Sequence, residues 1–412
     1  MTSTTTLIGP FTQLLTMASL PKRGPVKDEQ LEVIRHSGIL VKDGCIEDIG
    51  NYDKLQNLTE NHIKIEGDHV ALPGLVDCHT HICFGGNRSR DYALRNSGSS
   101  YLEIAAKGGG IWDTVRHTRE SDINGLKDGI IQRAEKLIKD GITTIEVKSG
   151  YGLSFEHEVK MLKSIREAND VLPCDLVPTC LAAHIIPKEF KENPEAYVQL
   201  IAYKLLPFIK EQGLANRVDA FVEKEAYTAE LIKPYLDQAR KLSFDITIHA
   251  DQFTPGGSKL AVEYKAISAD HLEASTDKEI KLLSEHNTIP VALPGASLGL
   301  GCAFTPARKL LDAGCSLAIA SDYNPGSAPM GHLMTQAAIL GTFEKLSNAE
   351  VLAGITCRAA DALNLKDIGS LCIGNKANLA IYPTDNYQNI TYHQGQLNPD
   401  MTIIKGKIVH HA

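Results

Sequence analysis

The sequence predicts an α/β protein: a (β/α)8 TIM barrel with a small β-sandwich domain built from both chain termini. Eight β-type runs alternate with helix-period segments through the middle of the chain, and short alternating β-type segments occupy both ends. Strands that alternate with helices pair in parallel through right-handed crossovers, and eight of them close a barrel. The chain has 412 residues, of which 43% are hydrophobic and 22% charged. That composition is typical of a folded globular protein.

The two ends of the chain have the pattern of short antiparallel strands. The N-terminal end includes LEVIRHSGILVKDGCIEDIG and HIKIEG, with the turn-type pairs DG and GD. The C-terminal end includes NLAIYP and MTIIKGKIVHHA, in which KGK is typical of a tight turn between two strands. We therefore expect residues 1–70 and 360–412 to form one composite β-sandwich domain, with residues 71–359 forming the catalytic barrel.

The barrel elements are predicted from the change of hydrophobic period along the chain. The eight expected strands cover residues 71–77, 142–148, 175–182, 218–223, 245–250, 266–271, 288–293 and 316–321. Apolar residues recur at spacings of three and four in the segments between them, which predicts helices over residues 124–141, 155–170, 194–213, 228–242, 276–286 and 305–314. The long insertion at 84–123 then becomes the loop after the first strand, at the end of the barrel where such enzymes carry their active sites.

The net charge and the cysteine content indicate which binding partners and which cellular compartment to expect. The net charge of −8 disfavours a nucleic-acid-binding protein, which needs clustered Lys and Arg. Nine cysteines without a CxxC pair indicate neither a disulfide framework nor a zinc ribbon and favour a reducing compartment. The sequence has neither a signal-peptide pattern nor an apolar run of about 18 residues. We expect a cytoplasmic protein that binds no nucleic acid or membrane, and base rates favour a homodimer.

Polar residues lie at or just beyond the ends of four of the predicted strands. His79 and His81 in LVDCHTH lie at i and i+2, so both imidazoles point to the same side of an extended chain. His249 and His271 lie at the ends of the fifth and sixth strands, and Asp322 directly follows the eighth. A single strand-end histidine is more often a hydrogen-bonded structural residue, but these five side chains would meet at one rim of the barrel. Three imidazoles and a carboxylate are a normal ligand set for Zn²⁺ or Fe²⁺ with an open position for water.

These residues resemble those of the metal-dependent amidohydrolase superfamily, whose members are barrels flanked by a small β-sandwich made from both termini. The resemblance is carried by LPGLVDCHTH, by the strand-end histidines and by SD at the eighth strand. Longer motifs resemble the imidazolonepropionase family within it: HTHICFGGNRSRDY, YLEIAAKGGGI, TTIEVKSGYGL, LAAHIIP, IHADQF, LPGASLGLG and SDYNPGSAP. This resemblance implies hydrolysis of the ring amide C–N bond of 4-imidazolone-5-propanoate to N-formimidoyl-L-glutamate, in histidine degradation.

The resemblance also implies roles for particular residues. The metal ligands would be His79, His81, His249 and Asp322, holding one divalent ion, zinc or iron. The substrate contacts would be Arg88, Tyr101, Tyr151, His184, Gln252, Asn324, Gly326 and Ser327. Asp322 is expected to accept the proton of the attacking water, while His271 and His184 steady the oxyanion or protonate the departing nitrogen. How these two histidines divide that work is left open. The Arg88 guanidinium suits a carboxylate because it can donate two parallel hydrogen bonds.

Two departures from the superfamily pattern bear on the chemistry. Many members have a carboxylic acid three residues after the fifth-strand histidine, where this chain has Gln252, which cannot transfer a proton. That glutamine disfavours the nearest alternative, ring deamination of a purine or pyrimidine. Binuclear members carry a bridging lysine after strand four, for which Lys224 is a weak candidate explained equally by a surface ion pair with Glu223. One metal is therefore expected. A non-catalytic binding or assembly barrel is disfavoured because all four ligands are present.

Overall fold

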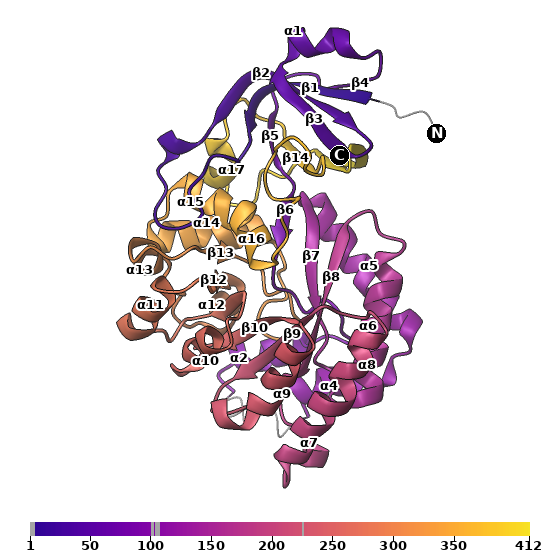
Figure 1. Cartoon of the computed structure of the whole chain (residues 1–412), viewed down its shortest axis with the longest axis vertical. Coiled ribbons are helices and arrows are strands. Elements are labelled where there is room, and N and C mark those ends of the chain that lie inside the picture. Colours follow the sequence, from indigo (N-terminus) through magenta and orange to yellow (C-terminus); the bar gives the residue numbers. More distant parts are fainter. Residues whose placement is uncertain (1–4, 100–102, 104–107, 225) are drawn as a thin grey trace.

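The computed structural model describes residues 5–99, 103, 108–224 and 226–412, and it confirms the predicted barrel with an added terminal sheet (Figure 1). The barrel strands follow one another in chain order, and every neighbouring pair is parallel. They are β6 (Leu75–Asp77), β7 (Ile142–Lys148), β8 (Asp175–Ala183), β9 (Arg217–Val222), β10 (Asp245–Ala250), β11 (Ser268–His271), β12 (Ile289–Ala292) and β13 (Ala318–Ile319).

Backbone contacts between the chain after β6 and the chain after β13 close the barrel. The Asp322 N–H donates to the His79 carbonyl at 3.0 Å, and the His81 N–H donates to the Tyr323 carbonyl at 2.9 Å. Through these two hydrogen bonds, Thr80 and Tyr323 pair as an isolated parallel β-bridge. Because these bonds lie just beyond the strand ends, they hold the HxH pair beside Asp322.

Helices cover the outside of the barrel (Figure 1). Those before β10 are α2 (Ser89–Asn96), α4 (Ile111–Glu120), α5 (Ile123–Lys139), α6 (Phe155–Asn169), α7 (Pro194–Leu200), α8 (Leu206–Glu211) and α9 (Ala229–Lys241). Those after it are α10 (Gly257–Glu263), α11 (Asp277–Ser284), α12 (Pro294–Leu300), α13 (Ala307–Asp312), α14 (Leu333–Glu344), α15 (Asn348–Gly354) and α16 (Cys357–Ala362). The insertion at 84–123 carries α2 and α4, at the end of the barrel away from the terminal sheet (Figure 1).

The helix expected over 194–213 is not one regular helix. A π-helical turn at Ile201–Leu205 separates α7 from α8. Pro207 stands in the first turn of α8. Proline has no backbone N–H and its ring clashes with the carbonyl four residues earlier, so the regular α pattern cannot continue through this position.

The second sheet joins the two ends of the chain. Its main path is β16-β15-β14-β5-β1-β2-β3, and β4 pairs with β1. Its strands are β1 (Thr5–Leu15), β2 (Val33–Lys42), β3 (Cys45–Asn51), β4 (His62–Lys64), β5 (Val70–Pro73), β14 (Leu379–Tyr382), β15 (Met401–Ile404) and β16 (Lys407–His411). Two short helices, α1 (Tyr52–Leu55) and α17 (Gln388–Tyr392), accompany it. Because β5 lies between β1 and β14, the domain is built from both termini. The exact domain bounds stay a prediction.

The single strand expected over 71–77 is two strands in different sheets. β5 belongs to the terminal sheet and β6 to the barrel, and Gly74 lies between them. A Cβ atom at this glycine would overlap the side chain of Thr143. The chain can therefore cross from one sheet to the other at this point only because the residue has no side chain.

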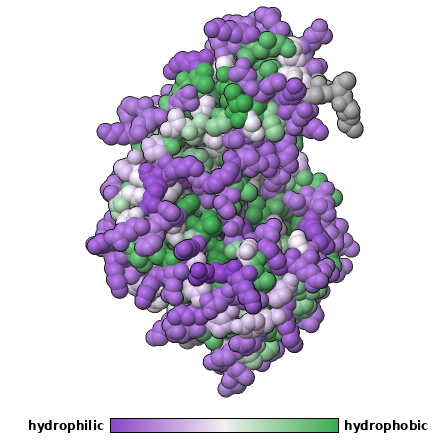
Figure 2. Space-filling view, in the orientation of Figure 1, coloured by the Kyte–Doolittle hydropathy of each residue, from purple (hydrophilic) through white to green (hydrophobic). Residues whose placement is uncertain are grey.

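Each sheet encloses apolar side chains of its own. The terminal sheet buries a cluster that includes Phe11, Ile39, Leu379 and Ile403. The barrel and its helices enclose a much larger cluster. Hydrophilic residues cover most of the face shown in Figure 2. Among the described helices, none combines the length and apolarity that crossing a membrane requires.

Candidate metal centre

Three predicted ligands meet at the carboxyl end of the barrel strands. The Nε2 atoms of His79 and His81 lie 3.2 Å apart. The Oδ1 atom of Asp322 lies 3.3 Å from His81 Nε2 and 3.6 Å from His79 Nε2. All three side chains are buried. Three potential donor atoms therefore face one point, which is the arrangement that chelation of a cation requires.

Two further histidines approach the same point from β10 and β11. The ring centroids of His79 and His249 lie 4.5 Å apart, and those of His249 and His271 lie 5.2 Å apart. The described residues contain two groups of three donors within 4.8 Å of one another: His79, His81 and Asp322, and His79, His249 and His271. His79 belongs to both groups. The described chain therefore has a buried His/Asp cluster that can hold a metal ion.

The environment keeps most of these imidazoles neutral. Burial lowers the pKa of His79 well below its ordinary value and lowers the pKa values of His81 and His249 to about 3. His271 differs: burial alone would lower the pKa of its ring, but the Glu273, Asp322 and Asp270 carboxylates together raise that pKa above its ordinary value. Burial raises the pKa of Asp322, and the neighbouring His271 opposes that effect. A neutral imidazole has a free lone pair, which is the form that binds metal.

Carboxylates that we did not predict contact the outer nitrogens of two of these histidines. His79 Nδ1 lies 2.6 Å from Asp270 Oδ2, and His249 Nδ1 lies 2.8 Å from Asp219 Oδ2. Both carboxylates lie beside the buried ammonium of Lys148. The sequence does carry a signal for them, because each is a charged residue within or at the end of an otherwise apolar strand run. A buried charge at such a place needs a partner.

The backbone turns sharply where two of these strands end. His271 has φ 87° and Asp322 has φ 51°, both in the left-handed region that residues other than glycine rarely adopt. Asp270 and His271 are adjacent, so a regular strand would send their side chains to opposite faces. The turn at His271 lets its ring approach His249 while Asp270 contacts His79. Thr305 Oγ1 donates to the His271 carbonyl at 2.5 Å and holds the turn.

His184 and Tyr151 extend the cluster on the side of His81. The rings of His81 and His184 are stacked with centroids 5.5 Å apart, and Tyr151 lies 5.4 Å from His184. His184 Nδ1 is 3.0 Å from the carbonyl oxygen of Gly150, which follows β7. The Nε2 atom of the same ring therefore points away from Gly150. Gly150 has φ 108°, and a Cβ there would lie 2.8 Å from the Leu181 carbonyl oxygen. A side chain at Gly150 would also lie 3.1 Å from His184 Nδ1. The absence of a side chain at Gly150 therefore lets His184 pack against this backbone.

Arg88 lies against the loop that follows β13. A Cβ atom at Gly326 would lie 2.5 Å from Arg88 Nη1, so the guanidinium packs directly on that glycine. Arg88 Nε donates to Asp91 Oδ2 at 2.8 Å. Asn324 Oδ1 accepts from the backbone N–H groups of Gly326 and Ser327 at 2.7 and 2.8 Å. Arg88, Asn324 and Gly326 help line a cavity of about 610 Å³.

The remaining predicted residues have different places. Tyr101 lies outside the described residues. Gln252 is half-buried in the turn after β10. The Oε1 atom of Glu223 accepts from the Phe253 N–H at 2.8 Å and clamps this turn, so Glu223 is a buried residue and not part of a surface ion pair. Lys224 itself is exposed.

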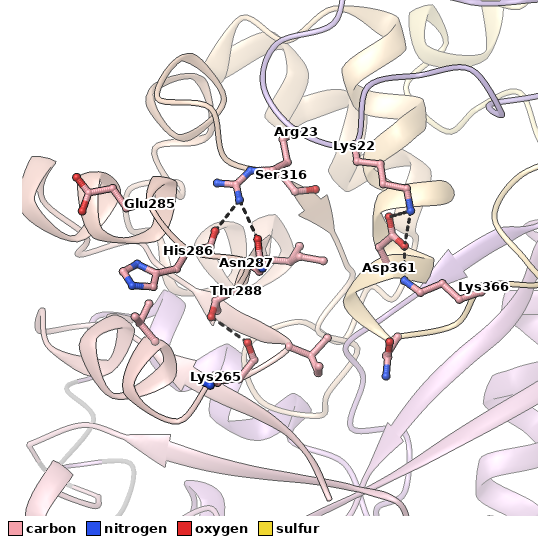
Figure 3. A pocket seen from close by; sticks show the side chains of 15 residues that line it. Lys22, Arg23, Lys265, Glu285, His286, Asn287, Thr288, Ser316, Asp361 and Lys366 are labelled. Atoms are coloured by element: carbon pink, nitrogen blue, oxygen red, sulfur yellow. Dashed lines mark hydrogen bonds and ion pairs between the residues drawn. The ribbon is translucent and has the colours of Figure 1, made fainter. Parts of the chain in front are cut away.

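A second cavity, of about 680 Å³, lies away from the metal cluster, between the N-terminal segment and the loops before β11 and β12 (Figure 3). Its cations are largely engaged within the protein. Arg23 donates to the carbonyls of Ser284 and His286 at 2.6 and 2.7 Å. Lys22 and Lys366 share the carboxylate of Asp361 (Figure 3). None of the predicted site residues that the structure describes lines this cavity.

Comparison with known proteins agrees with this geometry. The family model described as the amidohydrolase family matches residues 70–409. An imidazolonepropionase of Alkaliphilus oremlandii is 38% identical over 407 residues, covering 97% of this chain and 96% of that protein. One of Caldanaerobacter subterraneus is 39% identical over 381 residues, covering 92% of this chain and 91% of that protein.

Solved structures show the same fold at much lower identity. A zinc complex of atrazine chlorohydrolase from Arthrobacter aurescens is 15% identical, with a TM-score of 0.72 over 98% of this chain and 95% of that one. A zinc-bound adenosine deaminase from Xanthomonas campestris is 18% identical, with a TM-score of 0.71 over 98% of this chain and 93% of that one. The match of the family model over residues 70–409 shows that the chain belongs to the amidohydrolase family. Within that family it belongs with the imidazolonepropionases, to which it is similar over nearly its whole length.

Proposed function

We propose that this chain hydrolyses the ring amide C–N bond of 4-imidazolone-5-propanoate and releases N-formimidoyl-L-glutamate. The observation that carries this proposal is the buried His/Asp cluster at the strand ends, in a chain that is 38% identical over nearly its full length to an imidazolonepropionase. The cluster faces the same loops that hold Arg88 and His184. A location in the cytoplasm and a homodimeric state stay predictions.

The donor set fits one divalent ion, zinc or iron, held by His79, His81, His249 and Asp322. Asp270 accepts the Nδ1 proton of His79, so the Nε2 lone pair of that ring faces the cluster. The facing Nε2 atoms of His79 and His81 are both buried and lie beside a carboxylate oxygen, an arrangement that a cation stabilises. Such an ion, when bound, supplies a water nucleophile that is active near neutral pH.

Proton transfer then falls to the residues that surround the attacked carbonyl. Asp322 accepts the proton of the attacking water, because its carboxylate stands at the cluster and the side chain at 252 is an amide. His271 and His184 stand on two sides of the cluster, where each can stabilise the oxyanion or donate to the ring nitrogen that departs. The neighbouring Glu273, Asp322 and Asp270 carboxylates together outweigh burial and raise the pKa of His271, whereas burial lowers the pKa of His184 to about 3.

The propionate of the substrate is bound by Arg88 in this proposal. Only the Nε atom of its guanidinium is engaged by Asp91, so the two Nη groups can donate to a carboxylate in parallel. The missing side chain at Gly326 leaves room for the Arg88 guanidinium to pack against the loop backbone. The other proposed substrate contacts are Tyr101, Tyr151, Gln252, Asn324 and Ser327.

Chelation tests the proposed function directly. We expect the purified protein to consume 4-imidazolone-5-propanoate, followed as loss of its ultraviolet absorbance, to stop after removal of metal by a chelator, and to recover when Zn²⁺ or Fe²⁺ is returned. The non-enzymatic rate without protein is the baseline. Turnover that survives complete removal of metal would overturn the metal-dependent reaction, and absence of turnover with metal present would overturn the substrate.

Replacement of Arg88 tests the carboxylate site. Arg88→Ala is expected to raise KM by about 10- to 100-fold with a smaller change in kcat, because a charge-assisted pair of hydrogen bonds to the substrate is lost. Steady-state kinetics measures both constants. Arg90→Ala is the matched control, since Arg90 is an exposed arginine of the same loop, and its KM should be unchanged. An unchanged KM in Arg88→Ala would place the propionate elsewhere.

A further inference from the structure

Lys148 is a buried cation that the proposed reaction does not use. It is the last residue of β7, and its side chain has no exposed surface. Its Nζ atom lies 2.7 Å from Glu146 Oε1, 2.8 Å from Asp219 Oδ2 and 3.9 Å from Asp270 Oδ2. One ammonium group therefore lies among three carboxylates from three different strands of the barrel.

Two of those carboxylates reach the metal cluster. Asp219 contacts Nδ1 of His249, and Asp270 contacts Nδ1 of His79. A carboxylate that accepts the Nδ1 proton fixes the ring orientation and leaves the lone pair on Nε2 for a metal. The Asp270 contact has the geometry of a hydrogen bond, and Asp219 Oδ2 lies within 2.8 Å of His249 Nδ1, so both carboxylates are placed to orient a proposed ligand. The Lys148 ammonium is the cation that lies between these carboxylates.

Other roles for Lys148 do not agree with its surroundings. A proton donor to substrate would have to reach the substrate, whereas this ammonium is engaged by the carboxylates of Glu146 and Asp219. A modified lysine that bridges two metals would carry negative charge, and the three neighbouring carboxylates would repel it. A purely structural ion pair would not need to involve both carboxylates that contact histidines.

We propose that Lys148 is a positioning residue, which sets the orientation of His79 and His249 by holding Asp270 and Asp219 together. Without the ammonium, the two carboxylates repel each other across the site and turn away from the Nδ1 atoms. The imidazoles then lose their fixed direction, and the metal is bound more weakly and in a different geometry. This inference rests on the metal site proposed above.

Binding of Co²⁺ to the metal-free protein tests the proposal without any measurement of turnover. The dissociation constant comes from competition with a chromophoric chelator, and the visible d–d spectrum reports the coordination geometry. Lys148→Met and Asp219→Asn are each expected to weaken Co²⁺ binding by about 10- to 100-fold. The double variant is expected to lose much less than the product of the two single losses, because both changes act through one contact.

Arg358→Met is the matched control, because Arg358 is also a fully buried cation but donates to the carbonyls of Pro21 and Gly24 instead. It is expected to lower Tm and leave the Co²⁺ dissociation constant unchanged. Lys148→Arg keeps the charge and so protects folding if Lys148→Met yields no folded protein. Its longer, planar head group should still displace the carboxylates and alter the d–d spectrum.

The possible outcomes separate this inference from the proposed function. If the unaltered protein binds no Co²⁺, Zn²⁺ or Fe²⁺, the metal site itself is wrong. If the unaltered protein binds Co²⁺ and folded Lys148→Met binds it equally well, only the role of Lys148 is wrong. Multiplicative losses in the double variant, or an unaltered spectrum in Lys148→Arg, would overturn that role as well.

Discussion

Replacing Asp322 with Asn is expected to lower kcat by about two to four orders of magnitude, the contribution typical of a general base, while substrate still binds. The amide has nearly the same shape as the carboxylate but cannot accept a proton. Asp322 is buried with Oδ1 facing the two histidines of the HxH pair. The other candidate position for a proton acceptor, residue 252, is occupied by glutamine in this chain.

Because Asp322 is also a proposed ligand, the comparison must be made at equal metal content. Elemental analysis of each preparation gives that content, and steady-state kinetics at saturating substrate gives kcat per metal-loaded chain. Asp312→Asn is the matched control, since Asp312 is an exposed carboxylate that pairs with Arg308 on α13. Near-normal kcat in metal-loaded Asp322→Asn would show that another group accepts the proton.

The barrel could be predicted because each strand is a local signal. The segments 142–148 and 245–250 are strands with the predicted bounds. A short apolar, β-rich segment between two segments of helical period is recognisable from its own residues as a buried strand of a parallel sheet. The cluster followed from the same logic, because side chains at the ends of parallel strands share one rim. His79, His81, His249, His271 and Asp322 do lie together.

Long-range packing could not be predicted in the same way. The run at 71–77 has one continuous apolar pattern, yet Gly74 divides it between two sheets because the chain must pass close to Thr143. The pairs Asp270–His79 and Asp219–His249 join residues on different strands. Local periodicity shows that a charged residue is buried, but the partner depends on the register of the closed barrel.

Replacing His79 with Ala is expected to remove the bound metal almost entirely, from about one ion per chain to near zero, because both groups of three donors among the described residues contain His79 and neither is complete without it. His79 is the member shared by both groups of donors. Its ring also connects the cluster to Asp270, so its loss leaves that buried carboxylate without its histidine partner. We therefore expect Tm to fall as well.

Elemental analysis of His79→Ala and His81→Ala measures the metal, and thermal unfolding monitored by circular dichroism shows that each variant is folded. His286→Ala is the matched control, because His286 is an exposed histidine whose ring contacts the Leu282 carbonyl, and it should keep its metal. A folded His79→Ala protein that retains a full complement of metal would mean that the ion binds outside this cluster. The chemistry proposed for Asp322 would then have no nucleophile to act on.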